Sequence, residues 1–384
     1  MKNSTKISTS LSWIEVSREN ILNNIRVIRT KIGSDVKIAA VVKANAYGHG
    51  YHEIAQILQD EKIDFLAVHS LEEAFILKEG EYSQEILIVG YVPYDQLRKA
   101  VESDFHLTVY NTDTIKQLEK LKISRKAKVH LKLETGTNRQ GIDEKELPAF
   151  IDLLKETKNI ELVGASTHFA NIEDTTDHSY AQSQLDHYKE IIAEIENAGF
   201  EIPIKHTASS AASLLFSKTH YNMIRFGISL YGLWPSKETY LSYRLAGGEN
   251  NLLTPALTWK TKVAQIKNVP KGSFIGYGCT YRTTADSKIA VLPLGYYDGY
   301  DRKLSNLGYV LIKGERAQVR GRICMDNIMV DVTNIANVKI EDEVVLLGRQ
   351  DGDIITAEQM ASWAQTINYE IVARINPLLP RIII

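Results

Sequence analysis

Two hydrophobic patterns alternate along the first part of the chain. Short apolar runs typical of buried strands recur between residues 13 and about 240, and amphipathic stretches with helical apolar spacing separate most of them. Residues 19–33, for example, follow Ser17 as a potential N-cap and end at Gly33. The predicted strands are 36–43, 63–68, 85–90, 106–110, 127–134, 161–167, 202–206 and 223–232.

Strands that alternate with helices indicate a parallel sheet, because parallel neighbours need a crossover connection. Eight such units are the number that closes a barrel. An open doubly wound sheet is the alternative, but it does not call for eight strands, and no glycine-rich motif follows a strand at dinucleotide-binding spacing. We therefore predict an eight-stranded α/β (TIM-type) barrel over residues 13–240.

The pattern changes after Trp234. Residues 236–251 are polar and contain glycine, which is typical of a linker. Short strands and tight turns follow, and helical spacing returns only over 355–367. We predict a mostly β C-terminal domain over residues 241–384, with residues 1–12 pairing with it.

The composition excludes several classes of function. Lys plus Arg number 45 and Asp plus Glu number 47, so a phosphate-backbone binder with concentrated positive charge is not expected. The two cysteines, Cys279 and Cys324, are too few for a disulfide framework and lack metal-type spacing. The chain shows neither a secretory signal nor an apolar stretch long enough to cross a membrane, so we expect a cytoplasmic protein. The histidines lack paired metal-ligand spacing, and no metal is expected.

Lys43 is the first candidate for chemistry, since it ends the first predicted strand. In a barrel, the carboxyl ends of the strands face the active site. An amine there, next to apolar residues, loses solvation, which lowers its pKa and favours Schiff-base chemistry. A lone lysine at a strand end is more often a surface residue. Here small residues follow it, and then Tyr47, whose hydroxyl could bond a phosphate.

Nine motifs spread over nearly the whole chain strengthen that interpretation. They are AVVKANAYGHG, ETGTNRQGI, THFA, SSAAS, RFGISLYG, GYGCTY, PLGYYDG, RICMD and INYE. In this order they resemble the bacterial alanine racemases. The resemblance implies an α/β barrel followed by a β domain, pyridoxal 5'-phosphate as cofactor, and a head-to-tail homodimer that shares its active sites. It also implies interconversion of L- and D-alanine, which supplies D-alanine for peptidoglycan.

The resemblance assigns the cofactor site residue by residue. Arg225 would face the pyridine nitrogen and, having no proton to give up, would keep it unprotonated, which favours racemisation over transamination. His206 would orient Arg225. The phosphate would lie against Tyr47, Ser210, Gly227, Ile228 and Tyr369. A helix N-terminus near Ser210, with the serine as N-cap of a helix from Ala211, would also suit an anion.

Racemisation removes a proton from one face of a carbon and returns one to the other. The resemblance implies that Lys43 serves one face and Tyr277 of the partner subunit the other. Because a free tyrosine pKa is about 10, Tyr277 needs hydrogen bonds or positive charge nearby to act as a base. His168 resembles the residue that supplies such a bond.

The substrate carboxylate would bind Arg139, whose guanidinium suits a planar anion. Lys132 corresponds to a lysine that is carbamylated in many relatives. Tyr296 and Met325 resemble residues that narrow the substrate entrance, and Cys324 and Asp326 flank Met325 with a gate or a structural role. The chain departs from the common pattern at three positions, which leaves substrate breadth open: Ser209, Thr137 and Gln140.

Three alternatives remain at this point. A serine or broad-specificity racemase would use the same residues. A non-catalytic pyridoxal-phosphate-binding protein would share the barrel, but the roughly 140 residues after it argue otherwise. A barrel decarboxylase usually places a carboxylate at the pyridine nitrogen, where this chain has Arg225.

Overall fold

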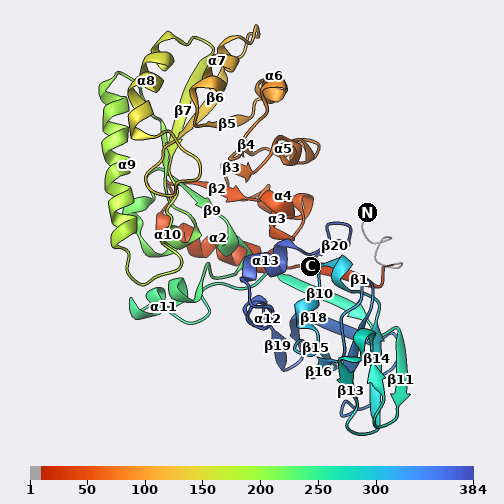
Figure 1. Ribbon diagram of the computed structural model, residues 1–384. Coiled ribbons are helices and arrows are strands. Elements are labelled where there is room, and N and C mark those ends of the chain that lie inside the picture. The colour runs from red at the N-terminus through yellow and green to blue at the C-terminus, as the bar shows by residue number, and fades with distance from the viewer. Residues whose placement is uncertain (1–9) are drawn as a thin grey trace. The chain divides into compact units, whose positions relative to one another are not determined.

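The computed structural model describes residues 10–384 and divides them into two compact units (Figure 1). The first, called here the barrel unit, contains residues 20–44 and 54–254. The second, called the β unit, contains residues 10–19, 45–53 and 255–384. The chain therefore passes from one unit to the other directly after Ala44.

The barrel unit is built on eight parallel strands in the order β8-β7-β6-β5-β4-β3-β2-β9. The N–H of Arg225 in the last strand donates to the carbonyl of Ala208, just beyond β8, at 3.0 Å, which brings the two ends of the sheet together. The prediction of an eight-stranded barrel is confirmed. The strands are β2 (Lys37–Val41), β3 (Phe65–Val68), β4 (Glu85–Ile88), β5 (His106–Val109), β6 (Ala127–Lys132), β7 (Ile160–Ser166), β8 (Ile204–His206) and β9 (Met223–Phe226).

Helices lie outside these strands, as Figure 1 shows for α8 and α9. Their buried residues recur at helical spacing, as at Ala181, Leu185, Tyr188 and Ile192 of α9. The helices after most strands are α4 (Tyr51–Leu58), α5 (Leu71–Lys78), α6 (Leu97–Glu102), α7 (Thr112–Glu119), α8 (Leu147–Glu156), α9 (Ser179–Asn197) and α10 (Ser210–Leu215), and α2 (Arg18–Ile32) precedes the first. Such a helical layer satisfies the apolar outer face of the strands.

The predicted linker over residues 236–251 is partly wrong. Helix α11 (Lys237–Leu245) occupies most of it and begins at Ser236, whose hydroxyl accepts the N–H of Thr239 at 2.8 Å. Thr239 and Tyr243 are buried. A serine N-cap and two inward-facing side chains thus outweigh the polar composition from which a linker was inferred.

The β unit contains a sheet in the order β11-β14-β17-β16-β15-β18-β10-β1-β20, with β19 beside β18, and a separate β12-β13 ribbon. Residues 1–9 lie outside the described part of the chain, but Ser12 already belongs to a strand of this sheet. The strands are β1 (Ser12–Val16), β10 (Leu257–Lys262), β11 (Gln265–Val269), β12 (Phe274–Ile275), β13 (Tyr281–Arg282), β14 (Ser287–Leu292), β15 (Tyr309–Ile312), β16 (Glu315–Val319), β17 (Ile328–Asp331), β18 (Glu343–Gln350), β19 (Asp353–Ile355) and β20 (Arg381–Ile383). The unit also holds helices α12 (Ala357–Ala364) and α13 (Asn368–Ala373).

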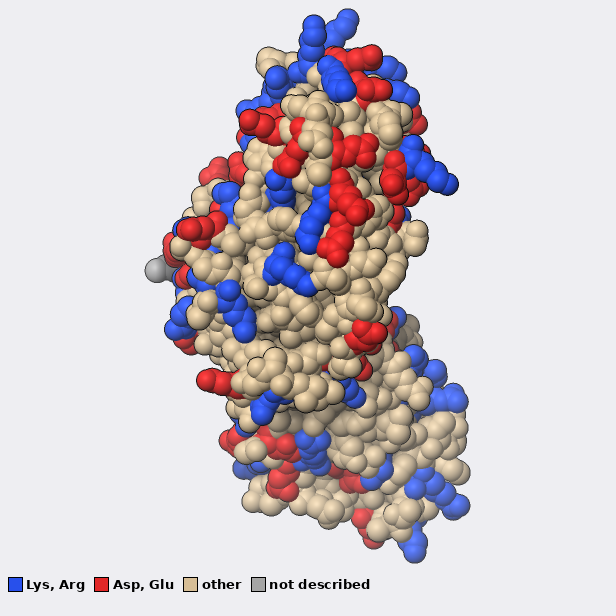
Figure 2. Space-filling model, turned by 90° about the vertical axis from the view of Figure 1, so that its left-hand side faces the viewer, with Lys and Arg blue, Asp and Glu red and all other residues tan. Residues whose placement is uncertain are grey.

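The surface carries charges of both signs. On the face shown in Figure 2, basic and acidic side chains are interspersed and no basic patch forms. Over residues 10–384, none of the helices has the length and apolar character needed to cross a membrane.

Candidate functional site

Lys43 lies two residues beyond β2, at the carboxyl end of the barrel strands, and opens the short helix α3 (Lys43–Tyr47). Burial lowers the pKa of its amine, the nearby Arg139 and Arg225 lower it further, and only Glu73 acts in the opposite direction. A larger share of the amine is therefore neutral at physiological pH than for an ordinary lysine. This is the form that attacks a carbonyl group.

Helix α3 is left-handed. Ala44, Asn45, Ala46 and Tyr47 have φ values of 53°, 54°, 52° and 53°. Each such residue costs about 1–2 kcal/mol, so the surrounding structure must hold the turn in place. Residue patterns gave no sign of this turn, because none of these side chains favours a left-handed run.

Hydrogen bonds fix the turn inside both units. In the barrel unit, Oε1 of Glu73 accepts the N–H of Ala44 at 2.7 Å, and its other oxygen accepts the N–H of His69 at 2.6 Å. In the β unit, the carbonyl of Gly48 accepts Nε and Nη2 of Arg381 at 3.1 and 3.0 Å. Neither Glu73 nor Arg381 was singled out from the sequence.

Position 48 lies so close to α13 that only glycine fits. Its φ is +85°, and a Cβ on it would lie 1.9 Å from the carbonyl oxygen of Val372 in α13. The same close approach brings Tyr47 near Tyr369, with ring centroids 6.0 Å apart. The structure therefore places together the two tyrosines that the sequence assigned to a phosphate.

Arg225 projects from β9 and is buried. Nη1 donates to the carbonyl and to Nδ1 of His206, at 2.7 and 2.9 Å, and Nη2 donates to the carbonyls of Thr167 and Thr207, at 2.8 and 3.1 Å. Burial lowers the pKa of Arg225 to about 10, so the guanidinium stays charged at neutral pH. Within residues 10–384 its Nε–H makes no hydrogen bond and no carboxylate pairs with it, which leaves one donor for a ligand.

Ser210 lies beside the turn that follows β9. Its Oγ accepts the N–H groups of Gly227 and Ser229 at 3.0 and 3.4 Å, so hydroxyl and backbone donors converge there with Ile228 between them. The prediction that Ser210 caps the helix from Ala211 is wrong, because α10 begins at Ser210 itself and Ser209 precedes it. The Oγ of Ser209 is buried and has no partner among the described residues.

His168 and Lys132 lie among several positive charges. Nδ1 of His168 is 3.4 Å from Nη2 of Arg225. Burial, followed by the charges of Arg225 and Arg139, lowers the pKa of Lys132 well below its usual value. Burial, followed by Lys132 and Arg225, does the same to the pKa of His168. Both shifts in pKa favour the uncharged forms of the two side chains.

Arg139 lies on an exposed turn after β6 that Glu134 organises. One oxygen of Glu134 accepts the N–H groups of Gly136 and Thr137, each at 2.6 Å, and the other accepts the N–H of Arg139 at 3.4 Å. Burial alone would raise the pKa of Glu134, but these backbone donors outweigh it and hold the pKa below its usual value. Glu134 was missed from the sequence, although a carboxylate before Gly136 is typical of a turn that needs an acceptor.

In the β unit, Tyr277 begins a short 3-10 turn (Tyr277–Cys279) between two glycines, Gly276 and Gly278, with φ of 70° and 72°. A Cβ on Gly278 would lie 2.7 Å from the guanidinium of Arg322, so the turn packs closely on that side chain. Tyr277 itself is 72% exposed. Its phenol is thus presented to whatever covers this surface.

The four residues assigned to the substrate entrance lie on two adjoining segments of the β unit. The N–H of Tyr296 donates to the carbonyl of Cys324, and the N–H of Tyr297 donates to that of Met325, both at 3.1 Å. Asp298 accepts the N–H of Gly295 at 2.8 Å; its burial and then the charge of Asp326 oppose this and raise its pKa. Tyr296 and Met325 are exposed, so this predicted gate lies open on the surface.

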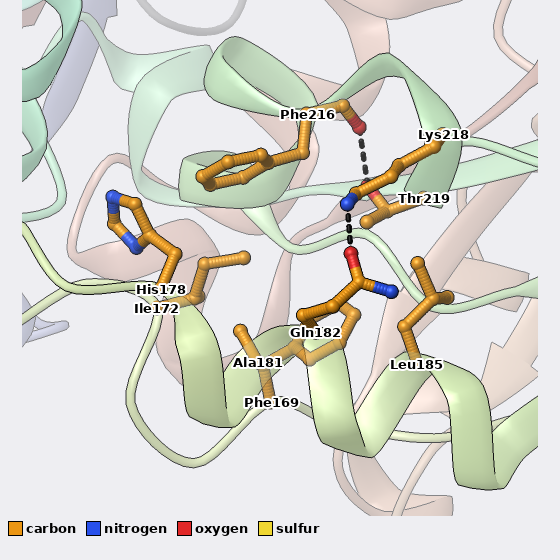
Figure 3. A pocket seen from close by; sticks show the side chains of 9 residues that line it. All are labelled: Phe169, Ile172, His178, Ala181, Gln182, Leu185, Phe216, Lys218 and Thr219. Atoms are coloured by element: carbon orange, nitrogen blue, oxygen red, sulfur yellow. Dashed lines mark hydrogen bonds between the residues drawn. The ribbon is translucent and has the colours of Figure 1, made fainter.

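A small cavity of about 50 Å³ is lined by Phe169 of the THFA motif together with residues of α9 and the segment after α10 (Figure 3). The rings of His178 and Phe216 face each other edge-on across it, with centroids 4.7 Å apart, and Lys218 hydrogen-bonds Gln182 at its mouth. It has room for about one or two water molecules and not for a cofactor. The histidines considered for a metal do not assemble either: across residues 10–384, no three His, Cys, Asp or Glu side chains form a metal-binding group.

The chain is similar to known proteins over nearly its whole length. The family model "Alanine racemase, N-terminal domain" matches residues 16–235, and "Alanine racemase, C-terminal domain" matches residues 256–383. The alanine racemase of Halothermothrix orenii is 42% identical and that of Methanococcus maripaludis 41% identical; the alignments cover 97% and 96% of this chain and 97% and 98% of theirs.

Solved structures extend the likeness to three dimensions. The alanine racemase of Clostridium difficile superposes with a TM-score of 0.90 at 36% identity, over 98% of this chain and 96% of that chain. The alanine racemase of Bacillus anthracis with bound L-Ala-P gives a TM-score of 0.91 at 38% identity, over 97% and 95% of the two chains. With two domain models in order and relatives this similar along their full length, the chain belongs to the alanine racemase family.

Proposed function

We propose that this protein interconverts L- and D-alanine by a two-base mechanism, with pyridoxal 5'-phosphate bound through Lys43. The surroundings of Lys43 carry the proposal. Its amine has a lowered pKa and lies at the carboxyl end of the barrel strands, near the buried Arg225, whose Nε–H is free to donate. Membership of the alanine racemase family supports the substrate.

The residues of the barrel unit fit this cofactor. Lys43 supplies the amine for its aldehyde, and the free Nε–H of Arg225 suits an aromatic nitrogen that accepts a hydrogen bond. Ser210 with the N–H groups of Gly227 and Ile228 suits a phosphate. In the β unit, Tyr47 and Tyr369 offer further hydroxyl groups for it. The unpartnered Oγ of Ser209 is a further polar atom consistent with a polar ligand.

When bound, pyridoxal phosphate withdraws electrons from the substrate and makes its α-hydrogen acidic. Arg225 moderates this effect, because a charged guanidinium gives the ring nitrogen a hydrogen bond and no proton. A moderate effect favours racemisation over transamination. It also argues against a decarboxylase, which would place a carboxylate where this chain has Arg225.

Two bases then act on opposite faces of the α-carbon. Lys43 holds or removes the proton on one face, and the phenol of Tyr277 does so on the other. His168 helps Tyr277: since Nδ1 of His168 faces a guanidinium that only donates, its hydrogen is on Nε2, where it can donate to the phenolate oxygen.

The Tyr277 that serves a given Lys43 comes from a second copy of the chain in a homodimer. The exposed aromatic and apolar side chains of the β unit support this arrangement, because such groups are usually covered in an assembly. They include Phe274, Tyr277, Tyr296, Tyr297 and Met325.

Arg139 binds the substrate carboxylate, and Tyr296 with Met325 narrows the entrance so that small side chains enter most readily. Lys132 carries a carbamate, since its lowered pKa favours the neutral amine that reacts with carbon dioxide, and the product would be a negative group beside Arg139 and Arg225. Cys324 and Asp326 support the gate. We further infer that the protein acts in the cytoplasm and supplies D-alanine for peptidoglycan.

A racemase assay with separate L- and D-forms of alanine, serine, lysine and arginine tests the proposal. We expect pyridoxal-phosphate-dependent racemisation of alanine with the highest kcat/KM. Faster serine turnover would favour a broad-specificity racemase of the same family. Cofactor binding without turnover of any of the four would favour a non-catalytic binding protein.

A further inference from the structure

A row of buried imidazoles runs through the interior of the barrel from Arg225. Nδ1 of His206 lies 2.9 Å from Nη1 of Arg225, and Nε2 of His206 lies 3.0 Å from Nδ1 of His130. Nε2 of His130 lies 3.0 Å from Nδ1 of His106. Nε2 of His106 in turn lies 3.2 Å from a carboxylate oxygen of Glu85.

The row crosses the barrel from end to end. His206 is the last residue of β8, at the end that carries the candidate site, whereas His106 and Glu85 are the first residues of β5 and β4, at the opposite end. His106 is opposite Lys128 in the register, two residues before His130 on β6. Because the histidines on neighbouring strands are offset by two residues, consecutive rings lie progressively further along the barrel, from one end to the other.

The barrel leaves space for these rings where apolar packing would be usual. A Cβ on Gly164 of β7 would lie 2.5 Å from Nδ1 of His130, so only glycine fits there. The β6–β7 register shifts between Val129 and His130. The ring of Phe65 stands edge-on to His106, with centroids 5.0 Å apart. Three imidazoles that interrupt an apolar interior need every polar atom satisfied.

The arginine fixes the direction of every hydrogen bond in the row. A guanidinium only donates, so Nδ1 of His206 must accept and its hydrogen is on Nε2. His130 then accepts at Nδ1 and donates from Nε2 to Nδ1 of His106, so the hydrogen of His106 is on Nε2, which lies 3.2 Å from Glu85. All three rings are therefore neutral and share one tautomer. Burial agrees with this, since it lowers the pKa of His106 to about 4 and the pKa values of His130 and His206 well below normal.

We propose that His130 and His106 are positioning residues of the racemase reaction. With His206 they form a one-way row of hydrogen bonds, called here the imidazole row, which ends beside the carboxylate of Glu85 and orients Arg225. Only the predicted effect on turnover rests on the proposed function; the arrangement of the hydrogen bonds does not. Without an acceptor for Nε2 of His206, that ring loses its preference for the tautomer that faces Arg225. The guanidinium plane, and with it the Nε–H meant for the cofactor, is then less well fixed.

The end of the imidazole row that lies away from Arg225 is charged and partly exposed. Glu85, which is about half exposed, also lies 3.5 Å from Lys128, and Lys128 lies 3.2 Å from Asp104. His106 therefore lies near one base and two acids, Lys128, Glu85 and Asp104, whereas the charged group that hydrogen-bonds the other end is Arg225. Arg125 also pairs with Asp104, so acids and bases balance in this cluster. The carboxylate that directly faces Nε2 of His106, that of Glu85, polarises the imidazole row in the direction that its hydrogen bonds already have.

Nitrogen NMR of the [15N]histidine-labelled holoenzyme tests the tautomers in the imidazole row without reference to activity. We expect three imidazoles that stay neutral with the hydrogen on Nε2 between about pH 6 and 8, assigned by their loss in His106→Gln, His130→Gln and His206→Gln proteins. A hydrogen on Nδ1, or an imidazolium, at any of the three at neutral pH would overturn the proposal even if the protein is a racemase.

The kinetics of three variants test whether the imidazole row contributes to turnover. His130→Gln keeps an acceptor and a donor in place, whereas His130→Leu removes both, and His220→Gln changes a buried histidine that bonds only the carbonyl of Ser213. We expect His130→Leu to lower kcat about ten- to hundredfold for both directions of racemisation, which is the scale of one lost buried hydrogen bond. The KM for alanine should stay nearly unchanged, because Arg139, which binds the substrate carboxylate, is not part of the imidazole row.

The Leu variant should also change the absorbance spectrum of the bound cofactor. In His130→Gln, kcat should lie within about threefold of the parent value and the spectrum should match that of the parent. His220→Gln should alter stability alone. Equal kcat and spectra for the Leu and Gln variants, or a loss in His220→Gln as large as in His130→Leu, would show that His130 only fills space. If His130→Leu does not fold, the tautomers of the unmodified protein still decide the proposal.

Discussion

Glu73 accepts the backbone N–H of Ala44 through Oε1 at 2.7 Å, one residue after the lysine that we propose to hold the cofactor. This contact begins a left-handed turn of four L-residues. It also leaves a carboxylate near Lys43 whose charge opposes the lowering of the lysine pKa. Backbone geometry and charge at the proposed centre thus depend on the same side chain.

Replacing Lys43 by alanine should abolish covalent capture of the cofactor. Borohydride reduction followed by peptide mass analysis should place pyridoxyl phosphate on Lys43 in the parent and nowhere in Lys43→Ala, and racemase activity should fall by about 10²–10⁴-fold or more. Lys37→Ala is the matched control, since Lys37 begins the strand that precedes Lys43 and pairs with Asp64 at 3.0 Å. Reduction onto another lysine in the parent would contradict the assignment.

The rate at which the apoenzyme captures pyridoxal phosphate should rise with pH through a midpoint below 10.5, the usual lysine value. The sign follows because the protonated amine cannot attack, and burial with Arg139 lowers the folded-state pKa of Lys43, so the neutral form appears at lower pH. Stopped-flow absorbance measures the rate. A midpoint at or above that of free lysine would mean that Lys43 is not desolvated.

Lys132 should carry a carbamate. Its amine nitrogen bonds the carbon of carbon dioxide and releases one proton, and the resulting anion is stabilised between Arg139 and Arg225. Carbon NMR of protein equilibrated with [13C]bicarbonate should show one carbamate resonance that is lost in Lys132→Ala and kept in Lys128→Ala. A spectrum without that resonance at saturating bicarbonate would leave Lys132 as a plain amine.

Two glycine variants separate backbone strain from packing. Gly33 and Gly48 both have positive φ, 78° and 85°, but a Cβ on Gly33 meets nothing within 4 Å and one on Gly48 meets the carbonyl of Val372 at 1.9 Å. Gly33→Ala should lower the free energy of unfolding by about 1–2 kcal/mol. Gly48→Ala should lower it by about 2–5 kcal/mol, since overpacking adds to strain.

Urea unfolding followed by circular dichroism measures both variants. Equal losses would mean that the close approach of Gly48 to α13 does not contribute to stability.

The barrel could be predicted from the sequence because its strands are short apolar runs at regular spacing, and residues at their carboxyl ends, such as Lys43 and His168, are then placed by topology alone. The sequence predicts a linker where the helix over Lys237–Leu245 lies, because polar residues dominate it and only two side chains, Thr239 and Tyr243, are buried. Composition describes the exposed face of such a helix better than its packed face.

Other features of the site depend on contacts between distant residues. The left-handed turn after Lys43 is held by Glu73 in the barrel unit and Arg381 in the β unit, which no local propensity can foresee. His106 and His130 belong to apolar strands and gave no motif of their own. Only the closed barrel aligns them with His206 and Arg225.

The most direct measurement of the two-base account is α-hydrogen exchange in deuterium oxide, followed separately for L- and D-alanine with the Tyr277→Phe protein. The account predicts a loss of about 10²–10⁴-fold for one enantiomer, with exchange of the other, served by Lys43, largely retained. An equal loss for both enantiomers would contradict it.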